Sequence, residues 1–360
     1  MTWPTVKLGD CVRLINGRAY SQHELLDSGT PIIRIQNLNG GDRWYFSNLE
    51  LSEEKYCNRG DLLFAWSASF GPYIWEGEKS IYHYHIWKVV PFKNVDKSFI
   101  FHLLNNITQQ VKEASHGASM LHMTKSGMEA WPIKLPPIAE QKRISEILDK
   151  AGKINRKREQ AIAKLDELTK STFIEMFGDP LKNNKNLPKQ KLTEFFKFKT
   201  GKLDSNAAVV DGKYPFFTCA KEDFLIDDFA FDEEALLLAG NNANADYSVK
   251  HYIGKFNAYQ RTYVINLTDQ TNTYQYAKAA LEFMLKSLKH ASKGSSTKYL
   301  TMGIFNRMDI LIPSIELQHK FKEKIKCIEQ IKNNEMKNQV NLDRLFRSLQ
   351  NKAFTTGFNA

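Results

Sequence analysis

The sequence of 360 residues contains only four cysteines, and none stands in a CxxC or CxH pairing. Their scarcity excludes the usual zinc motifs and a disulfide framework, and it is typical of a reducing compartment. No apolar run reaches the roughly 18 residues of a membrane-spanning helix. The opening residues, MTWPTVKLGD, lack the apolar core of a signal peptide. We therefore expect a cytoplasmic protein with no membrane segment.

Motifs of common enzymes are also missing. GxGxxG and Walker loops, HExxH, GxSxG and the Asn-Pro-Pro-aromatic motif of adenine methyltransferases do not occur. Alternation in YHYH (82–85) would place His83 and His85 on one face of a strand, where two imidazoles could hold a metal. No carboxylate or cysteine adjoins them, so ordinary packing or DNA contact is the favoured interpretation. We expect no cofactor, no metal and no catalytic residue.

Basic charge is concentrated in two segments. The chain has a net charge of +10 and 42% hydrophobic residues, enough to build the cores of two domains. Residues 142–170 hold nine Lys/Arg against five Asp/Glu, and residues 319–352 hold nine against four. This excess indicates a polyanionic partner, although Lys-rich helices also serve solubility alone.

An internal repeat organises the chain. Five pairs of segments recur in the same order, at offsets between 174 and 184 residues. The pairs are VKLGDCVRLINGR (6–18) with QKLTEFFKFKTGK (190–202), TPIIRI (30–35) with YPFFTC (214–219), GDLLFAW (60–66) with EALLLAG (234–240), SHGASMLHMT (115–124) with SKGSSTKYLT (292–301), and PPIAEQKRISEILDK (136–150) with PSIELQHKFKEKIKC (313–327).

Each repeat reads as a mixed α/β domain followed by one long helix. Short β-branched and aromatic runs predict strands, and residues 97–113 and 273–289 predict shorter helices. The strand candidates are PIIRIQNL, DLLFAW, YHYHIWKVV, ALLLAG and RTYVINL. The resulting division is domain 1 at 1–135, a helix at 136–178, domain 2 at 179–312 and a helix at 313–357.

In both long helices apolar residues recur at alternating spacings of three and four residues, as in a coiled coil, over about four heptads. An antiparallel alignment centred on Arg158 and Glu335 places small seam residues opposite large ones, with one polar layer that would set the register. Ile144 would then face Leu349. The alternative is that each helix packs only on its own domain.

Polar, basic and aromatic side chains cluster where predicted strands end. Arg, Asn and Gln can read base edges in the DNA major groove, and Lys, Ser and backbone amides suit phosphates. A surface-loop role with no function is the alternative for any single residue. The DNA-binding candidates are Arg18, Tyr20, Arg34, Gln36, Asn37, Arg43, Trp66, Ser67, His116, Ser119, Lys125, Lys202, Lys221, Asn241, Asn242, Gln260, Arg261, Lys293, Ser295 and Lys298.

The segment WPIKLPPIAEQKRISEILDKAGKINRKREQAIAKLDELTKSTFIEMFG (131–178) resembles the central region of type I restriction–modification specificity subunits. Its Leu-Pro-Pro-hydrophobic-x-Glu-Gln-x-x-Ile start (135–144) carries most of the likeness. The second copy departs from it, because Leu317 replaces Glu140 and Ser314 replaces Pro137.

This resemblance implies a fold and a function. The fold would be two pseudo-twofold-related target recognition domains joined by two antiparallel coiled-coil helices. Each domain would read half of a bipartite DNA sequence, and the helices would set the gap between the halves. Two modification subunits would dock for adenine methylation and restriction subunits for cleavage, so the chain itself would be non-catalytic.

Three alternatives remain open. The first is a subunit of a related two-domain system without a separate restriction subunit. The second is a self-contained nuclease or modification enzyme, which would need activity from the isolated chain. The third is a coiled-coil scaffold with two protein-binding domains, which would not bind DNA in the salt-dependent way that phosphate contacts require.

Overall fold

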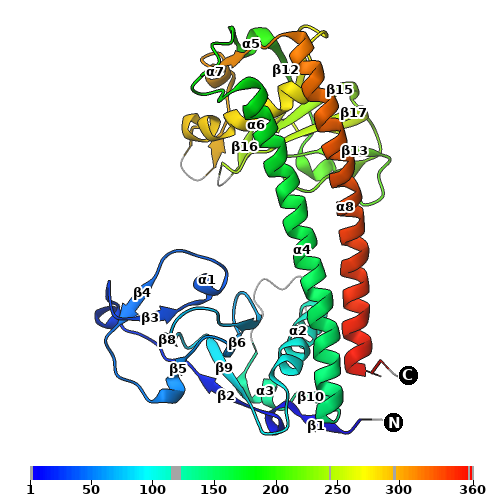
Figure 1. Ribbon diagram of the computed structural model, residues 1–360. Coiled ribbons are helices and arrows are strands. Elements are labelled where there is room, and N and C mark those ends of the chain that lie inside the picture. Colours follow the sequence, from blue (N-terminus) through cyan, green and yellow to red (C-terminus); the bar gives the residue numbers. More distant parts are fainter. Residues whose placement is uncertain (1–2, 115–122, 243–244, 295–296, 356, 359–360) are drawn as a thin grey trace. The chain divides into compact units, whose positions relative to one another are not determined.

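The chain folds into two compact units (Figure 1). Unit 1 comprises Met1–Glu159 with Asn338–Ala360, and unit 2 comprises Gln160–Lys337. The computed structural model describes residues 3–114, 123–242, 245–294, 297–355 and 357–358. Both units mix helices with sheets, which confirms the predicted mixed α/β class. Within these described ranges no helix has the length and apolarity needed to cross a membrane.

Unit 1 contains two four-stranded sheets, ordered β2-β9-β6-β7 and β4-β3-β8-β5, and a two-stranded sheet of β1 and β10. Its strands are β1 (Thr5–Lys7), β2 (Val12–Asn16), β3 (Thr30–Ile33), β4 (Tyr45–Ser47), β5 (Tyr56–Cys57), β6 (Leu62–Ala65), β7 (Gly71–Ile74), β8 (Ser80–Tyr82), β9 (Ile86–Pro91) and β10 (Pro132–Lys134). Its short helices are α1 (Ile35–Leu38), α2 (Lys97–Ala114) and α3 (Lys125–Glu129).

Unit 2 contains a six-stranded sheet ordered β12-β18-β15-β17-β13-β14 and two two-stranded sheets, β11-β20 and β16-β19. Its strands are β11 (Lys189–Lys191), β12 (Phe196–Thr200), β13 (Tyr214–Phe217), β14 (Phe224–Ile226), β15 (Phe231–Ala239), β16 (Asn241–Asn242), β17 (Val249–Ala258), β18 (Thr262–Leu267), β19 (Lys298–Tyr299) and β20 (Asp309–Leu311). Its short helices are α5 (Leu192–Phe195), α6 (Tyr274–Ala291) and α7 (Met302–Phe305).

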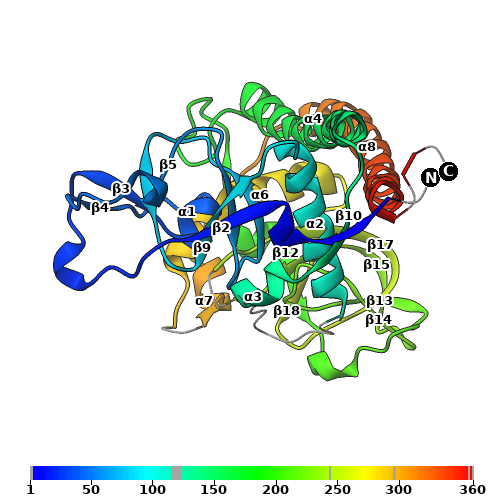
Figure 2. The same cartoon turned by 90° about the horizontal axis from the view of Figure 1, so that it is seen from below.

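The two units follow one plan, as the repeat predicts. In unit 1, β1 pairs antiparallel with β10, and β3 pairs parallel with β8. In unit 2, β11 pairs antiparallel with β20, and β13 pairs parallel with β17. Helices α2 and α6 bury one apolar face each, as helical spacing of their apolar residues requires. In unit 1, α2 lies between the β2–β9 sheet and the long helices (Figure 2).

Two predicted strands need correction. PIIRIQNL is a strand only to Ile33, because the chain turns into α1 at Ile35. YHYH is not a strand on which histidines alternate: β8 ends at Tyr82 and β9 begins at Ile86. Backbone bonds force the turn, since the His83 N–H donates to Ile33 O at 2.9 Å and the Ile86 N–H donates back to His83 O at 2.9 Å.

A buried glutamine fixes the start of each long helix, α4 (Ile138–Phe177) and α8 (Ile315–Thr355). Gln141 is 1% exposed; its Oε1 accepts from the Asp96 N–H at 2.8 Å and its Nε2 donates to Pro136 O at 2.9 Å.

Gln318 makes the same contacts in unit 2, 177 positions later. It is fully buried, accepts from the Thr273 N–H at 3.0 Å and donates to Pro313 O at 3.2 Å. Thr273 is the N-cap of α6, and the Asp96 carboxylate accepts from the Phe99 N–H in the first turn of α2. One side chain thus joins the start of a long helix to the start of a short one.

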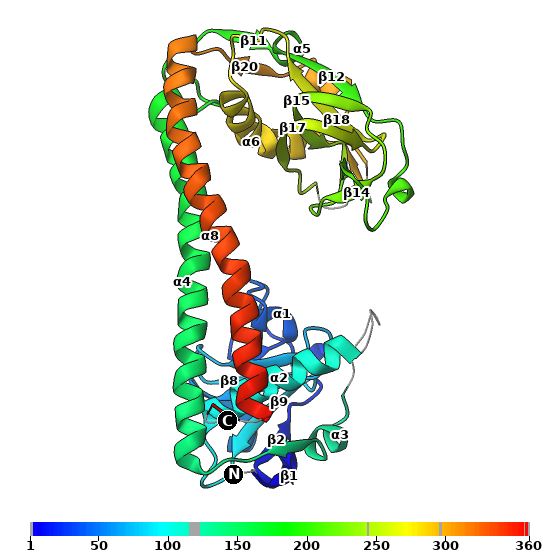
Figure 3. The same ribbon diagram turned by 90° about the vertical axis from the view of Figure 1, so that its right-hand side faces the viewer.

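Each long helix begins in one unit and ends in the other. Ile144 and Leu148 of α4 pack in the core of unit 1, together with Ala353 and Phe354 from the end of α8. In unit 2, Phe321 from the start of α8 packs against Phe173 and Phe177 from the end of α4, with ring centroids 5.7 and 5.2 Å apart. Within each unit the two helices run antiparallel and side by side (Figure 3).

The register of this pairing differs from the predicted one. With Arg158 opposite Glu335, Asn155 would face Asn338 and Asp166 would face Cys327. Instead, Asn155 donates to Asp343 at 3.1 Å in unit 1. In unit 2 the partner of Asp166 is Lys332.

Both observed partners lie five positions beyond the expected ones, 343 against 338 and 332 against 327. Extending the register of unit 1 places Arg158 opposite Val340. An Arg158–Glu335 layer would join residues of different units; it stays a prediction, and the shift within both units counts against it.

The mismatch between Glu140 and Leu317 has a local cause. Both side chains are partly buried: Leu317 packs against the core of unit 2, whereas Glu140 forms an ion pair with Arg143 at 3.1 Å in unit 1. One copy of the helix start therefore uses this position for apolar packing and the other for an ion pair.

We expect Gln141→Ala and Gln318→Ala each to lower the free energy of unfolding by about 1–3 kcal/mol, because each change leaves a buried backbone N–H and a carbonyl unpaired. Urea unfolding followed by circular dichroism measures the loss. Gln160→Ala and Gln330→Ala, exposed on the same helices, are the matched controls. Equal losses for buried and exposed glutamines would contradict the assigned role.

Candidate nucleic-acid interface

In unit 1, four strand ends meet around the turn at residues 83–85. The Arg18 N–H, after β2, donates to Tyr82 O at 3.2 Å. The Trp66 N–H, after β6, donates to His85 O at 3.1 Å, and the His83 N–H holds the end of β3 through Ile33 O. The structure thus brings together candidates that lie far apart in the sequence.

The turn carries a cluster of aromatic rings. Centroids of His83 and His85 lie 4.9 Å apart, those of Tyr84 and His85 4.0 Å, and those of Trp66 and His85 5.0 Å. Burial, followed by the nearby His85 and Arg34, lowers the pKa of His83 to about 4, so this imidazole is neutral near pH 7. Among the described residues no group of three metal-ligating side chains occurs, here or elsewhere.

Beside the turn lies a hollow of about 430 Å³. Two guanidinium groups lie over the ring of Tyr45 in its wall, Arg34 at 5.2 Å and Arg43 at 5.1 Å from the ring centroid. The hollow is lined by Arg34, Ile35, Gln36, Arg43, Tyr45, His83, Tyr84 and His85. A concave surface with aromatic walls and two guanidinium groups suits the edge of a base or a phosphate.

Some predicted contact residues also make internal bonds that shape the surface, and their contact with DNA stays a prediction. Asn37 is 9% exposed, and its side chain accepts from the Arg34 N–H at 2.9 Å and donates to Arg43 O at 3.0 Å. Gln36 donates to the same carbonyl at 2.7 Å. Ser67 is 6% exposed.

Arg18 and Tyr20 are also held by internal contacts. Arg18 pairs with Glu24 at 2.8 Å and lies over the ring of Tyr20, whose hydroxyl is 3.5 Å from Tyr82 O. Lys125 begins α3 and pairs with Glu129 at 3.6 Å. His116, Ser119 and Ser295 lie outside the described residues.

Unit 2 repeats the backbone scaffold with other side chains. The Tyr259 N–H donates to Phe217 O at 2.9 Å, as His83 does to Ile33. The Gly240 N–H donates to Arg261 O at 2.7 Å, as Trp66 does to His85. Lys202 directly precedes a parallel bridge between Leu203 and Tyr259 that corresponds to the bridge between Arg18 and His83.

Close backbone approach explains the glycines shared by the repeats. A β-carbon at Gly17 would lie 2.3 Å from Tyr82 O and His83 O, and one at Gly201 would lie 1.7 Å from Ala258 O. Each glycine lets one strand end pass directly over the next.

The remaining candidates of unit 2 gather at a small sheet. Asn241 and Asn242 of β16 pair with Tyr299 and Lys298 of β19, and the Lys293 N–H donates to Tyr299 O at 3.1 Å. The Arg261 guanidinium lies 5.9 Å from the centroid of the Tyr299 ring.

Two further candidates of unit 2 have acidic partners. Gln260 donates to Asp204 at 3.4 Å, and Lys221 pairs with Asp246 at 2.6 Å. The Asp246 carboxylate holds the pKa of Lys221 above its ordinary value. Sequence reasoning named His83 and His85 for packing or DNA contact but did not select Tyr45, Tyr84 or Tyr299. The YHYH run was a signal for Tyr84 and the repeated SKGSSTKYLT segment was one for Tyr299, whereas Tyr45 had none.

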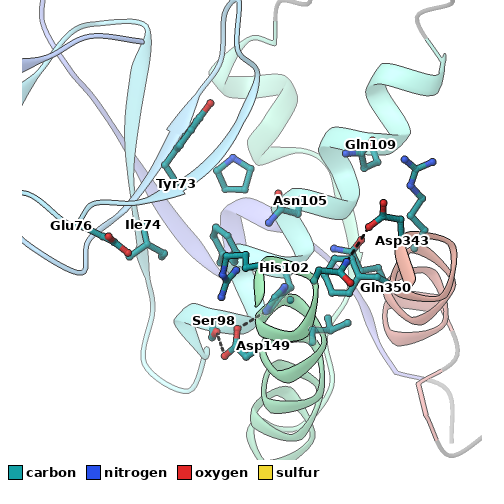
Figure 4. A pocket seen from close by; sticks show the side chains of 18 residues that line it. Tyr73, Ile74, Glu76, Ser98, His102, Asn105, Gln109, Asp149, Asp343 and Gln350 are labelled. Carbon is teal, nitrogen blue, oxygen red and sulfur yellow. Dashed lines mark hydrogen bonds and ion pairs between the residues drawn. The ribbon is translucent and has the colours of Figure 1, made fainter. Parts of the chain in front are cut away.

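A groove of about 870 Å³ also lies within unit 1, between β7, α2, α4 and α8 (Figure 4). On its wall His102 contacts the Asp149 carboxylate at 2.8 Å, and Ser98 donates to the same carboxylate at 3.1 Å. Burial lowers the pKa of His102, outweighing the neighbouring Asp149, which acts to raise it. The contacts tie α2 to α4, and Arg156 and Arg347 add positive charge to the groove.

The family model of the type I restriction modification DNA specificity domain matches the chain twice, over residues 1–165 and 184–342. Each match covers one repeat, and the two together cover most of the sequence.

Two relatives show different extents of similarity. The type I restriction enzyme EcoDI specificity subunit of Escherichia coli is 42% identical over 134 residues, 37% of this chain and 29% of that protein. The chain thus matches less than a third of that relative's length. The MjaVIII specificity subunit of Methanocaldococcus jannaschii is 21% identical over 392 aligned positions, 98% of this chain and 92% of that protein.

Solved structures agree in fold. A type I restriction-modification S subunit from M. genitalium superposes with a TM-score of 0.60 at 15% identity, covering 98% of this chain and 96% of that one. A chain from a study of complex assembly and conformational transition of the type I R-M system gives 0.52 at 15% identity, covering 99% and 98%. At this identity the likeness concerns the fold alone.

Burial of His102 leads to an expected pH dependence of stability. Because the pKa of His102 is lower folded than unfolded, its contribution to stability is present above the ordinary histidine pKa and is lost as pH falls through it. The urea midpoint should therefore fall less between about pH 7.5 and about pH 5.5 in His102→Gln than in the wild type. His23→Gln, at an exposed histidine of unit 1, should match the wild type. If the urea midpoint depended on pH identically in all three proteins, the assignment of a lowered pKa to His102 would be refuted.

Proposed function

The chain belongs to the type I restriction–modification DNA specificity family, and on that premise we propose that it is the non-catalytic, DNA-reading subunit of such a complex. Each unit would read one half of a bipartite DNA sequence. The observation that carries the proposal is the repeated scaffold of strand ends, which holds different side chains in the two units. One scaffold with two sets of polar groups suits two readers of different sequences.

The chemistry of both surfaces supports DNA as the ligand. Unit 1 offers Arg34 and Arg43 beside aromatic rings, and unit 2 offers Arg261, Asn241 and Asn242. These types of side chain make the specific contacts of the major groove. A net charge of +10 adds the sequence-independent attraction to phosphates.

The long helices would set the distance between the half-sites. Helix α4 has 40 residues and α8 has 41, and each runs without interruption from one unit into the other. Helices of this length measure about 60 Å, which exceeds the roughly 34–36 Å of one turn of DNA. If the two helices pair along their apolar seams, their length would fix the distance between the two half-sites.

Partner subunits would supply the chemistry that this chain lacks. We propose that two modification subunits dock on the long helices for adenine methylation, and that restriction subunits cleave DNA in the complete assembly. Much of the basic charge lies on α4 and α8, so part of it would serve these interfaces. A related system without a separate restriction subunit would use the same DNA-reading surfaces.

When the chain is co-expressed with its modification subunit, methylated adenines mapped across the host genome should fall within a split motif of fixed gap. Binding of the purified complex to that motif should weaken as salt rises, with a slope of log K against log salt of about −0.9 per phosphate contact. Cells that express the modification subunit alone are the control.

Unmethylated DNA together with salt-independent binding would favour the scaffold alternative. DNA cleavage or methylation by the isolated chain would instead favour an enzyme. A continuous motif with no gap would contradict the spacer role of the helices.

Removing one heptad from facing stretches of both helices, around Asn155 and Asp343, should shorten the gap and leave both half-site sequences unchanged. Seven residues correspond to about 10 Å, or roughly three base pairs. Motif mapping measures the gap. Deletion from α4 alone is the control, and it should disturb pairing of the helices and weaken recognition. New half-site sequences with the old gap would contradict the mechanism.

A further inference from the structure

Arg34 and Arg43 of unit 1 share one aromatic ring, that of Tyr45, and have no acidic partner among the described residues. Arg13 pairs with Glu54 at 3.5 Å and Arg18 pairs with Glu24 at 2.8 Å. Within the described part of the chain, neither Arg34 nor Arg43 forms an ion pair; each lies over Tyr45 instead. Neither guanidinium donates a hydrogen bond to a described residue, so the N–H donors of both stay available at the hollow.

The backbone that carries the two arginines is held by one buried side chain. Asn37 accepts from the Arg34 N–H and donates to the Arg43 carbonyl, at 2.9 and 3.0 Å, and Gln36 reinforces the second contact. Tyr45 follows two residues after Arg43 on β4, where its backbone pairs with Ile32. The loop is therefore closed upon itself before any ligand binds, which lowers the ordering cost of binding.

The chemistry of the hollow beside Arg34 and Arg43 favours some base edges over others. Two forked donors and no carboxylate line it, so it favours a group that offers acceptors. In the major groove guanine presents two adjacent acceptors, O6 and N7, whereas adenine presents one acceptor beside an amino donor. His83 at the wall is neutral and adds no third cation.

We propose that Arg34 and Arg43, supported by Tyr45, read guanine in the half-site of unit 1. This inference rests on the proposed function. Unit 2 lacks an equivalent pair, because the segment after β13 that corresponds to Arg34 reads TCAK (218–221) and Arg261 lies alone over Tyr299. The paired arginines therefore act on one half of the motif.

The test uses the complex of the full chain with its modification subunits and selects bound duplexes from a library with random half-sites. Wild type should require at least one guanine in one half-site. Arg34→Gln or Arg43→Gln should reduce that preference by about 5- to 150-fold and shift it toward adenine, which glutamine can pair. The other half-site and the gap should not change, whereas Arg261→Gln should alter only the other half-site.

Two matched comparisons separate base reading from general effects. Tyr45→Phe keeps the ring and should keep the guanine preference, whereas Tyr45→Leu removes the ring and should weaken it. Arg13→Gln removes a surface charge of unit 1 away from the hollow and should leave the preference intact.

A phosphate contact would give a different result. In that case Arg34→Gln and Arg43→Gln would weaken binding equally on all sequences and reduce the salt slope by about one, which would overturn the inference. A bipartite motif with no guanine in the affected half would also overturn it, while the proposed function would stand. Absence of any bipartite selection would refute the proposed function itself.

Discussion

The buried glutamine at the start of each long helix is the contact on which the architecture depends. A fully enclosed amide must satisfy its donors and its acceptor inside the protein, so its position permits little movement. Gln141 and Gln318 meet this requirement by binding the backbone at the start of a short helix and at the proline just upstream. The direction of each long helix is thereby set by its own α/β domain.

The second constraint on the structure is that the core of each unit includes the end of the long helix that begins in the other unit. Phe354 completes the core of unit 1 and Phe173 and Phe177 complete that of unit 2, although each comes from the helix that begins in the other unit. Neither domain can bury its apolar surface using only its own continuous segment. The helices are therefore part of both folds.

The sequence predicted the elements better than their contacts. Residues 97–113 were expected as a helix and form Lys97–Ala114, because apolar residues at helical spacing are a local signal. YHYH satisfies a strand pattern equally well, yet backbone bonds from distant strand ends make it a turn. The helix register could not be deduced, since the polar contacts that differ from the predicted register, such as that of Asn155 with Asp343, leave no mark in the apolar seam pattern. The burial of the phenylalanines at the helix ends could not be deduced either, because it depends on residues far away in the sequence.

The sequence alone determined the class of protein, the two-part plan and the family resemblance. These follow from the composition, the missing catalytic motifs and the repeated PPIAEQ and PSIELQ helix starts, because such features are read from neighbouring residues. Tertiary structure decided which candidates share a surface. It gave Asn37 hydrogen bonds to the backbone of Arg34 and Arg43, and it placed the ring of Tyr45 beside both guanidinium groups. Such roles depend on strands that pair across tens of residues, and no local pattern encodes which strand ends meet.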